Sequence, residues 1–320
     1  MDLSILIPTY NRPDFLVRLL RSLEAAKPCD LEWELLIVDN NSAPDRFGAI
    51  EAAIAGSSLP ARLLSEPTPG KSRALNTAIR AAQGRLVAFL DHDVSVHPGY
   101  LGGIQEVVRG VDPCRVFGGR VLAPWPSEPP DWIRQRGPLS TSFGPIVMHD
   151  YGDVSREYDH TMRRPVGCNF LCERSLFERH GYFDVRLGPG AAPGLETMGG
   201  EESELLQRFQ SGGECIRYAP HIVVDHPVDP ARTTRAAFRR RYFVSGRSGP
   251  YLARQSYPSL FGIPRYLFRR LAGAVGGTVW ARLRGDGMRA LDHELNVCRF
   301  MGAMYEYRRV HCAAGRTEAR

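Results

Sequence analysis

Apolar residues in the first 120 positions come in short runs that are separated by stretches of mixed character. Four runs have the length and composition of strands: LSILIP (3–8), EWELLIVD (32–39), ARLLSE (61–66) and RLVAFLD (85–91). Helix-like stretches lie near residues 13–26, 44–55, 70–82 and 98–109. Strands that are apolar almost throughout and that alternate with helices predict a parallel sheet covered on both faces.

Polar residues follow three of these predicted strands at the point where each strand ends. Ligands of such sheets bind beyond the carboxyl ends of the strands, so these groups should face one opening. The first turn contains no glycine, which argues against the GxGxxG loop of dinucleotide-binding oxidoreductases. The residues are Pro8, Thr9, Tyr10 and Asn11 after the first strand, Asp39 to Ser42 at the second, and Asp91, His92 and Asp93 at the fourth.

Asp91 and Asp93 stand two residues apart at the end of a predicted buried strand. Two carboxylates in this arrangement can reach one divalent cation, and that cation can hold a diphosphate. Acidic residues also cap the helices that follow strands, and this alternative stays open for the pair taken alone. Its place at the ligand edge of the predicted sheet favours the cation site.

Lys71 lies at the start of the third predicted helix, between Gly70 and Ser72. Its charge, combined with the free N–H groups of a helix start, favours an anion there. The alternative is an ordinary solvated lysine. For Asp39 the alternative is a turn former, because Asp and Asn bond their own backbone in turns.

The second half of the chain contains a predicted buried strand, helix and turn at residues 167–184, followed by a glycine-rich segment, expected to be mobile, that leads into an acidic helix near Glu201 (188–209). Acidic residues are favoured in a first helical turn by the macrodipole alone, so a structural reading of these glutamates stays open. His226 follows a further strand-like run.

Six segments, taken in order, resemble the successive signatures of glycosyltransferase family 2. The resemblance covers roughly residues 3–226 and implies the GT-A fold, a Rossmann-like, mostly parallel sheet with helices on both faces. It implies inverting transfer of one sugar from a nucleotide sugar to a hydroxyl of a glycan or lipid-linked glycan, with Mn²⁺ or Mg²⁺ as cofactor. The segments are SILIPTYNRP, LLIVDNNS, PGKSRALNTAI, FLDHDV, GCNFLCERSLFERHGYFD and GGEESELLQRF.

The resemblance also implies roles for single residues. It assigns Asp39 to the nucleotide base or ribose, Lys71 to a phosphate, and the Asp-x-Asp pair to the cation and diphosphate. His226 is similar to a late histidine that completes the metal site in some GT-A enzymes. The expected donor site is Pro8, Thr9, Tyr10, Asn11, Asp39, Lys71, Asn76, Asp91 and His92, and the expected metal ligands are Asp91, Asp93 and His226.

The family pattern Glu-Asp-x-x-Leu-x-x-Arg is matched by residues 201–208. This match places Glu202 where the family has its catalytic aspartate, so the side chain is one methylene longer here. Inverting displacement needs a base that is separate from the cation and lies on the face opposite the leaving group. We therefore expect Glu202 to be the base, with Glu201 the less favoured candidate. The expected acceptor side consists of Trp132, Asn169 and Glu201.

Residues 123–145 are rich in proline and contain Trp125 and Trp132. A long segment of this kind is often a functional loop. We expect tryptophan to stack on a sugar of the acceptor. The alternative is that the two rings only hold the loop against the domain.

Charge divides the chain unevenly. Residues 1–230 carry a net charge of −7, whereas residues 231–320 carry +13. Arginines alternate with apolar residues in 238–243 and 262–287, and the longest uncharged apolar run, 271–281, is too short to span a bilayer. The pattern predicts helices that lie on an anionic membrane surface, with packing on the catalytic domain as the alternative. Nucleic acid is not expected as a partner, because no module for it is present.

The resemblance implies a GT-A domain at 1–228, with a nucleotide-sugar half at 1–122 and an acceptor half at 123–228, and the charge pattern predicts a basic helical region at 229–320 after it. The start of the chain lacks an export signal, so we expect a cytoplasmic protein with peripheral contact to the inner face of the cell membrane. Seven cysteines without CxxC pairs argue against a disulfide framework, and Cys168 and Cys172 should be core packing.

Two other functions stay open from the residues. A sugar nucleotidyltransferase would share an α/β nucleotide site but needs a glycine-rich phosphate loop after the first strand, and PTYNRP has none. A non-catalytic binding module on the same fold would not need the carboxylates Asp91, Asp93 and Glu202.

Overall fold

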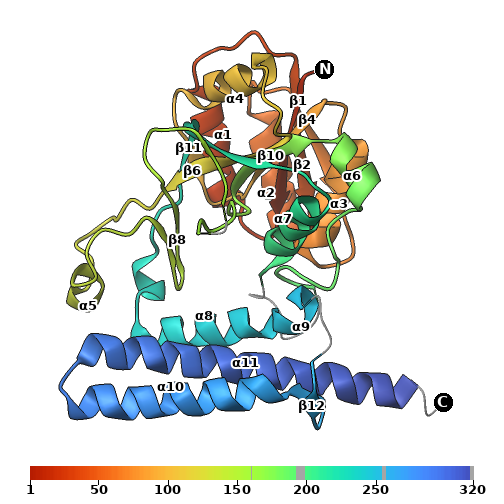
Figure 1. The fold of residues 1–320 in the computed structure, drawn as a ribbon. Coiled ribbons are helices and arrows are strands. Elements are labelled where there is room, and N and C mark those ends of the chain that lie inside the picture. The colour runs from red at the N-terminus through yellow and green to blue at the C-terminus, as the bar shows by residue number, and fades with distance from the viewer. Residues whose placement is uncertain (160, 192–198, 254–256, 318–320) are drawn as a thin grey trace.

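The computed structural model describes residues 1–159, 161–191, 199–253 and 257–317. A central sheet with helices on both faces forms the upper part of the molecule, and the long helices of the C-terminal region form a separate layer beneath it (Figure 1). The glycine-rich segment predicted within 188–200 lies partly outside the described residues.

Parallel strands form the first half of the sheet, as the sequence predicts. Their order is β3-β2-β1-β4, and every pair among them is parallel. The register of β1 and β2 sets Thr9 beside Asp39, so the polar ends of these two strands are neighbours. The strands are β1 (Leu3–Thr9), β2 (Trp33–Asp39), β3 (Ala61–Ser65) and β4 (Leu86–Leu90).

Four helices alternate with these parts of the sheet: α1 (Pro13–Glu24), α2 (Pro44–Ala55), α3 (Lys71–Ala81) and α4 (Tyr100–Arg109). Helix α1 shows why the sequence folds in this way. Pro13 occupies its first turn, where a missing N–H costs nothing, and Asp14 complements the helix dipole. Leucines at 16, 19, 20 and 23 form one buried stripe against the sheet.

The second half of the sheet departs from simple alternation. Strand β10 (Asn169–Glu173) lies between β4 and β6 (Val116–Leu122) and is antiparallel to both. Beyond β6 come β11 (Ile216–Asp225), which is parallel to it, and β5 (Ser95–Val96), which is antiparallel to β11. Helices α6 (Ser175–His180) and α7 (Glu201–Ser211) confirm the helices expected there. Shorter elements are α5 (Asp131–Arg134), β7 (Thr141–Phe143), β8 (Ile146–His149) and β9 (Arg156–Glu157).

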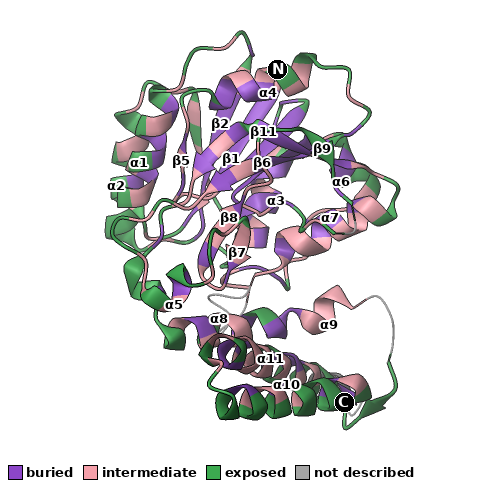
Figure 2. Cartoon of the chain, turned by 60° about the vertical axis from the view of Figure 1, so that its left-hand side comes forward, coloured by how far each residue is buried: buried purple, intermediate pink, exposed green. Residues whose placement is uncertain are grey.

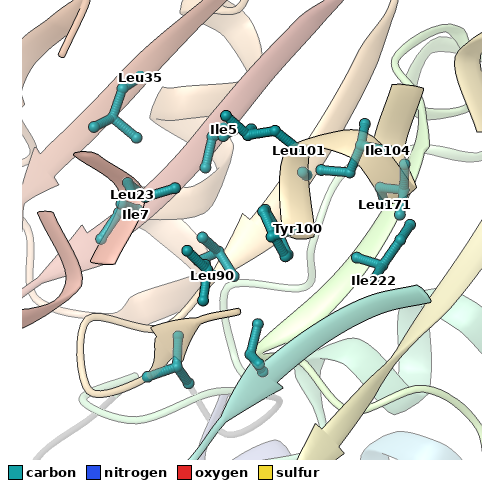
Figure 3. Packing of buried hydrophobic residues seen from close by; sticks show 14 of the residues in the cluster. Ile5, Ile7, Leu23, Leu35, Leu90, Tyr100, Leu101, Ile104, Leu171 and Ile222 are labelled. Carbon is teal, nitrogen blue, oxygen red and sulfur yellow. The ribbon is translucent and has the colours of Figure 1, made fainter. Parts of the chain in front are cut away.

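Two apolar clusters cover the two faces of the sheet. Consecutive residues of β1 point to opposite faces, so that Ile5 and Ile7 belong to one cluster and Leu6 to the other. Figure 3 shows part of the first cluster, in which Tyr100 and Leu101 of α4 pack against the strands. Both faces are therefore buried, which explains why the strand sequences are apolar throughout.

The C-terminal region is helical, as predicted. Its main elements are α8 (Arg235–Arg247), α10 (Arg265–Leu283) and α11 (Gly287–Thr317), and α11 packs against both of the others. None of the helices in the described part of the chain has the length and apolar character needed to cross a bilayer. Smaller elements are η1 (Pro230–Arg232), α9 (Gly249–Leu252), β12 (Ser259–Leu260) and β13 (Ile263–Pro264).

A buried cluster joins this helical layer to the loop at 123–145. Phe238 of α8 is completely buried against Phe143 and Trp132, with ring centroids 4.8 Å from each. Leu291 and Leu295 of α11 belong to the same cluster. Trp132 and Trp125 therefore help to hold the loop in place, which was the alternative to sugar stacking. The acceptor contact of Trp132 stays a prediction.

The cysteines differ in part from expectation. Cys168 and Cys172 are free and buried in the core, as predicted. Cys114 and Cys215 form a disulfide, although the odd cysteine count argued against such bonds. They lie just before β6 and β11, so the pairing of these two strands brings together cysteines that are far apart in the sequence.

Candidate active site

The loops that follow β1 and β2 are tied to each other. The Asn11 amide donates to Ser42 Oγ at 2.8 Å, and Asn11 Oδ1 accepts from the Ala43 amide at 2.8 Å. Asp39 Oδ2 accepts from the Ser42 amide at 3.1 Å. Asn11 has a positive φ of 53°, a conformation that asparagine tolerates better than most residues. These hydrogen bonds therefore fix the loops after β1 and β2 relative to each other at this edge of the sheet.

Asn40 ties the same edge to the start of α3. Its Nδ2 donates to the carbonyls of Glu66 and Thr68, and its Oδ1 accepts from the Gly70 amide at 2.8 Å. Sequence reasoning treated Asn40 only as a turn residue. Its burial could not be read from the sequence, because the partners lie 26 to 30 residues away.

Several polar atoms at this edge are buried and have no hydrogen-bond partner within the described residues: Thr9 Oγ1, Asp39 Oδ1, His92 Nδ1 and Glu201 Oε2. A buried polar atom without a partner is costly, and such atoms mark places where a ligand can bind. A surface cavity of about 490 Å³ opens at the loops that follow β1 and β2 and at the starts of α1 and α2, lined by Asn11, Arg12, Asp14, Ala43, Asp45 and Arg46. The strand ends that were expected to hold the donor thus keep unused hydrogen-bonding capacity.

Lys71 lies between two acidic side chains. Its Nζ is 2.5 Å from Asp91 Oδ1 and 3.4 Å from Glu201 Oε1. Burial disfavours the ammonium, but the carboxylates of Asp91 and Glu201 outweigh burial and raise the pKa of Lys71. Burial likewise opposes the charge of Asp91, yet the Lys71 ammonium holds the pKa of that carboxyl below its ordinary value. Lys71 is therefore positively charged and Asp91 is negatively charged. Glu201 is the second carboxylate partner of the Lys71 ammonium.

The start of α3 is less open than the sequence suggested. The Lys71 amide donates to the Pro189 carbonyl at 2.9 Å, and Ser72 Oγ donates to the Leu187 carbonyl at 2.7 Å. The amide of Lys71 is therefore not free for an anion, which corrects the argument from free N–H groups. The ammonium of Lys71 is therefore the main basis that remains for an anion site at this helix start.

Asp93 and His226 face each other across the end of the sheet. Their closest atoms, Asp93 Oδ1 and His226 Nε2, are 3.7 Å apart. They meet because β5 follows Asp93 and pairs with the last residues of β11, which directly precede His226. Within the described residues, no three His, Cys, Asp or Glu side chains gather closely enough to form a metal site.

The residues present nevertheless fit a divalent cation in their chemistry. Carboxylate oxygens and an imidazole nitrogen are ligands that Mn²⁺ accepts, and carboxylates suit Mg²⁺ as well. Asp91 already has the Lys71 ammonium as a partner. Asp93 Oδ1 and His226 Nε2, which face each other, are therefore the atoms best placed to bind a cation. His92, between the two aspartates, stacks on Phe15, and burial lowers its pKa despite these neighbours.

Glu202 lies on the first turn of α7, beside Glu201. Its side chain packs over Gly167, where an added Cβ would lie 3.5 Å from Glu202 carbon atoms. Burial, followed by the neighbouring Glu201 charge, raises the pKa of Glu202 to about 8. Lys71 and Asp91 are close enough for their charges to act on this pKa too. Glu202 is thus a carboxyl that exchanges a proton near neutral pH, next to the Lys71 and Asp91 pair.

Other parts of the fold hold both ends of α7: its last turn, and the glycines that precede its first residue. Arg208 pairs with Glu204 at 2.7 Å and donates to the Tyr182 carbonyl at 2.9 Å. Ser248, between α8 and α9, donates to the Gly199 carbonyl at 2.5 Å. Gly200 has a φ of 107°, which only glycine adopts readily. The C-terminal helical layer therefore contacts the segment that leads into Glu201 and Glu202. Packing of these helices on the catalytic domain was the alternative that the sequence left open.

Two predicted asparagines are engaged in the fold. Asn76 is buried, and its amide group forms two hydrogen bonds of 3.0 Å with the Phe183 backbone. Asn169 Nδ2 donates at 2.9 Å to the carbonyls of Arg120 and Ile222, and Gly119 leaves room for it. Their contacts to donor and acceptor stay predictions. Of the remaining donor residues, Tyr10 is largely exposed at this edge and Pro8 is half-buried in β1.

Comparison with known proteins connects this chain to glycosyltransferases. Residues 4–181 match the model of glycosyl transferase family 2. The chain is 27% identical over 282 residues to the succinoglycan biosynthesis protein ExoM of Rhizobium meliloti (strain 1021), covering 87% of this chain and 82% of that protein. It is 29% identical to the undecaprenyl-phosphate 4-deoxy-4-formamido-L-arabinose transferase of Pseudomonas syringae pv. syringae (strain B728a), over 54% of this chain and 51% of that protein.

A solved structure shows the same fold at low sequence identity. The mannosyltransferase PcManGT from Pyrobaculum calidifontis, in complex with GDP-Man and Mn²⁺, superposes with a TM-score of 0.50 and 16% identity. The match covers 98% of this chain and 75% of that one. It confirms the GT-A architecture that the sequence predicted. With more than half of its length matched by the family model, the chain belongs to glycosyl transferase family 2.

Proposed function

We propose that this glycosyltransferase moves one sugar from a nucleotide sugar to a hydroxyl of a glycan or lipid-linked glycan, with inversion at the transferred carbon and with a divalent cation. The observation that carries the proposal is Glu202. It is a carboxyl with a pKa of about 8 that lies within electrostatic reach of the Lys71 and Asp91 pair. A base with such a pKa can accept a proton close to neutral pH.

The donor would lie along the carboxyl ends of β1, β2 and β4. Asp39 Oδ1 and Thr9 Oγ1, both buried and unpaired within the described residues, are suited to the ribose or base. The Lys71 ammonium is suited to a phosphate oxygen, which would take over one of its contacts with a carboxylate. Glu201 is a positioning residue in this proposal, because its carboxylate contacts the Lys71 ammonium at 3.4 Å.

Asp93 and His226, with Asp91, would hold the divalent cation. When bound, the cation would offset the negative charge that grows on the diphosphate oxygens. A solved neighbour in complex with GDP-Man and Mn²⁺ supports the use of a cation. A relative named as an undecaprenyl-phosphate transferase supports a lipid-linked acceptor.

Glu202 would remove the proton of the acceptor hydroxyl as that oxygen attacks the anomeric carbon. The new bond forms on the face opposite the nucleoside diphosphate, and the bond from the anomeric carbon to the diphosphate oxygen breaks. The proton stays on Glu202, and the electron pair leaves with the diphosphate. Transfer through one such displacement inverts the anomeric configuration.

The test is a panel of UDP- and GDP-sugars incubated with the purified chain and Mn²⁺, recording which nucleoside diphosphate is released. The double variant Asp91→Ala/Asp93→Ala should lose release and cation-dependent nucleotide binding, while its circular dichroism stays unchanged. Asp30→Ala, an exposed aspartate at the opposite end of the strands, is the matched control and should behave as wild type. Full activity of the double variant in the presence of a chelator would contradict the cation site.

A further inference from the structure

Helix α10 has a continuous apolar face that no other described element covers. The residues Phe268, Ala272, Val275, Val279 and Leu283 are all exposed, and their spacing of three or four places them on one side of the helix. Val279 is 54% exposed and Leu283 is 82% exposed. Figures 1 and 2 place α10 on the side of the helical layer that is farthest from the sheet.

The opposite side of α10 explains why this face is not part of the core. Leu267, Ala274 and Ala281 recur every seven residues, are buried, and form the seam with α11. Small alanines at two of these positions let the two helices approach closely. The packing of α10 is therefore complete on one side only, and the apolar face on its outer side is not required by the fold.

A hairpin at the start of α10 adds a second apolar group. In the turn between β12 and β13, Phe261 is 70% exposed and adopts a positive φ of 53°. An aromatic residue rarely takes this backbone conformation, and an exposed one gains no packing energy from it. The base of the hairpin is fixed, because Ile263 packs with Leu267 and Ala303. The hairpin lies at the level of α10 (Figure 1), and its turn exposes Phe261 to solvent.

The charge around this face is of one sign. Residues 257–284 contain five arginines and no acidic residue. Among the described residues, Arg265, Arg269, Arg270 and Arg284 form no ion pair with a carboxylate, while Arg282 reaches Glu294 at 3.2 Å. On a helical projection, Arg265 and Arg269 share the outer side with the apolar residues. An apolar stripe edged by unneutralised arginines complements a surface that is negatively charged outside and apolar beneath.

We infer that the outer face of α10 and the Phe261 turn form a docking surface for an anionic lipid bilayer, with α10 lying in the plane of the interface. A helix of this kind buries its apolar side at the boundary of headgroups and acyl chains, and arginines near the surface attract anionic lipids. The 19 residues of α10 make this surface about 28 Å long, at the rise of about 1.5 Å per residue of an α-helix. With α10 on the membrane, α11, α8 and the sheet follow in that order with increasing distance from it (Figure 1). The inference does not depend on which sugar is transferred.

The test measures binding of the full chain to vesicles by co-sedimentation. Binding is expected to vesicles of phosphatidylglycerol and phosphatidylcholine, to be weak with phosphatidylcholine alone, and to fall as salt screens the attraction. Arg265→Gln/Arg269→Gln should weaken binding by about 30-fold, since each arginine near such a surface contributes about fivefold. Arg18→Gln/Arg80→Gln, which removes two exposed arginines from α1 and α3, is the matched control and should bind as wild type.

The apolar contribution is tested in the same way. Phe261→Ser/Leu283→Ser should weaken binding at least about tenfold. The control Val111→Ser/Val154→Ser removes two other exposed apolar residues, from the sheet part of the molecule, and should have no effect. Circular dichroism and melting temperature check that all four variants remain folded.

Three results would overturn the proposal: equal binding to neutral and anionic vesicles, absence of binding to both, or equal weakening by the control variants. Light scattering without lipid gives a further check. A dimer that dissociates on Phe261→Ser/Leu283→Ser would assign the face to a second copy of the chain instead of the bilayer.

Discussion

At the level of single residues, Glu201 and Glu202 are neighbours with different surroundings. Glu201 is buried and contacts Lys71, whereas Glu202 lies over Gly167. A base acts mainly in the transition state, so Glu202→Gln should keep nucleotide-sugar affinity while lowering kcat roughly 10²- to 10⁴-fold. Turnover and calorimetric affinity, measured on the same preparation, check this separation of rate from binding.

A companion variant and a folding control make that prediction specific. Glu202→Asp should also be slow, because the backbone is placed for the longer side chain. Melting at pH 8 serves as the control for folding. Burial raises the pKa of Glu202 from 4.5 to about 8 in the folded state, so ionisation of this carboxyl lowers the free energy of unfolding as the pH rises through this range. Glutamine resembles the protonated acid and should melt no lower than wild type there. Normal turnover in Glu202→Gln would remove the base role from this residue.

The pH profile of kcat provides a separate prediction. Glu202 must lose its proton to act as a base, so kcat should rise with pH and level off above about 8. Besides burial, the negative charge of Glu201 raises this pKa, so Glu201→Gln should lower it and move the rising limb to lower pH. The profile is measured with saturating donor for both proteins. An unchanged or more alkaline limb in Glu201→Gln would contradict the assigned interaction.

At the level of elements, periodicity and strand ends predicted the first half of the sheet well. The predicted stretch 44–55 coincides with α2, and the other early elements agree within a few residues. These elements are local, because apolar runs and terminal proline or glycine define them. The ligand edge followed from the same reasoning, since parallel strands end on one side of a sheet.

The second half could not be predicted as well, because its order depends on pairing between distant segments. Nothing in the sequence of β10 shows that it runs antiparallel between β4 and β6. The same limit applies to the site. Lys71 and Asp91 are 20 residues apart in the sequence, and Ser248 and Gly199, which are joined by a hydrogen bond, are 49 apart. Neither contact can therefore be predicted from the spacing of residues along the chain. The residue types were predictable, and their partners were not.

At the level of the whole molecule, the helical layer and the sheet part are joined by packing and not by charge alone. Phe238, Leu291 and Leu295 pack with Phe143 and Ile146 of the segment between the two halves of the sheet. Val244 of α8 packs against Leu187, close to the start of α3. We therefore propose that the domain boundary lies between residues 228 and 229. The architecture changes there from a sheet to a helical layer, and the two parts stabilise each other.

A fragment of residues 1–228 tests this mutual stabilisation. It would expose Phe143, Ile146 and Leu187, and burying each of these side chains contributes about 1.5 to 3 kcal/mol to the free energy of unfolding. Their sum is a large share of a typical stability of about 5 to 15 kcal/mol. The fragment should therefore melt well below the full chain and aggregate on warming. A fragment of residues 1–307 keeps Leu291 and Leu295 in place and should melt close to the full chain. Cooperative melting of 1–228 within a few degrees of the full chain would show instead that the sheet part folds alone, and that the helical layer is dispensable for the active site.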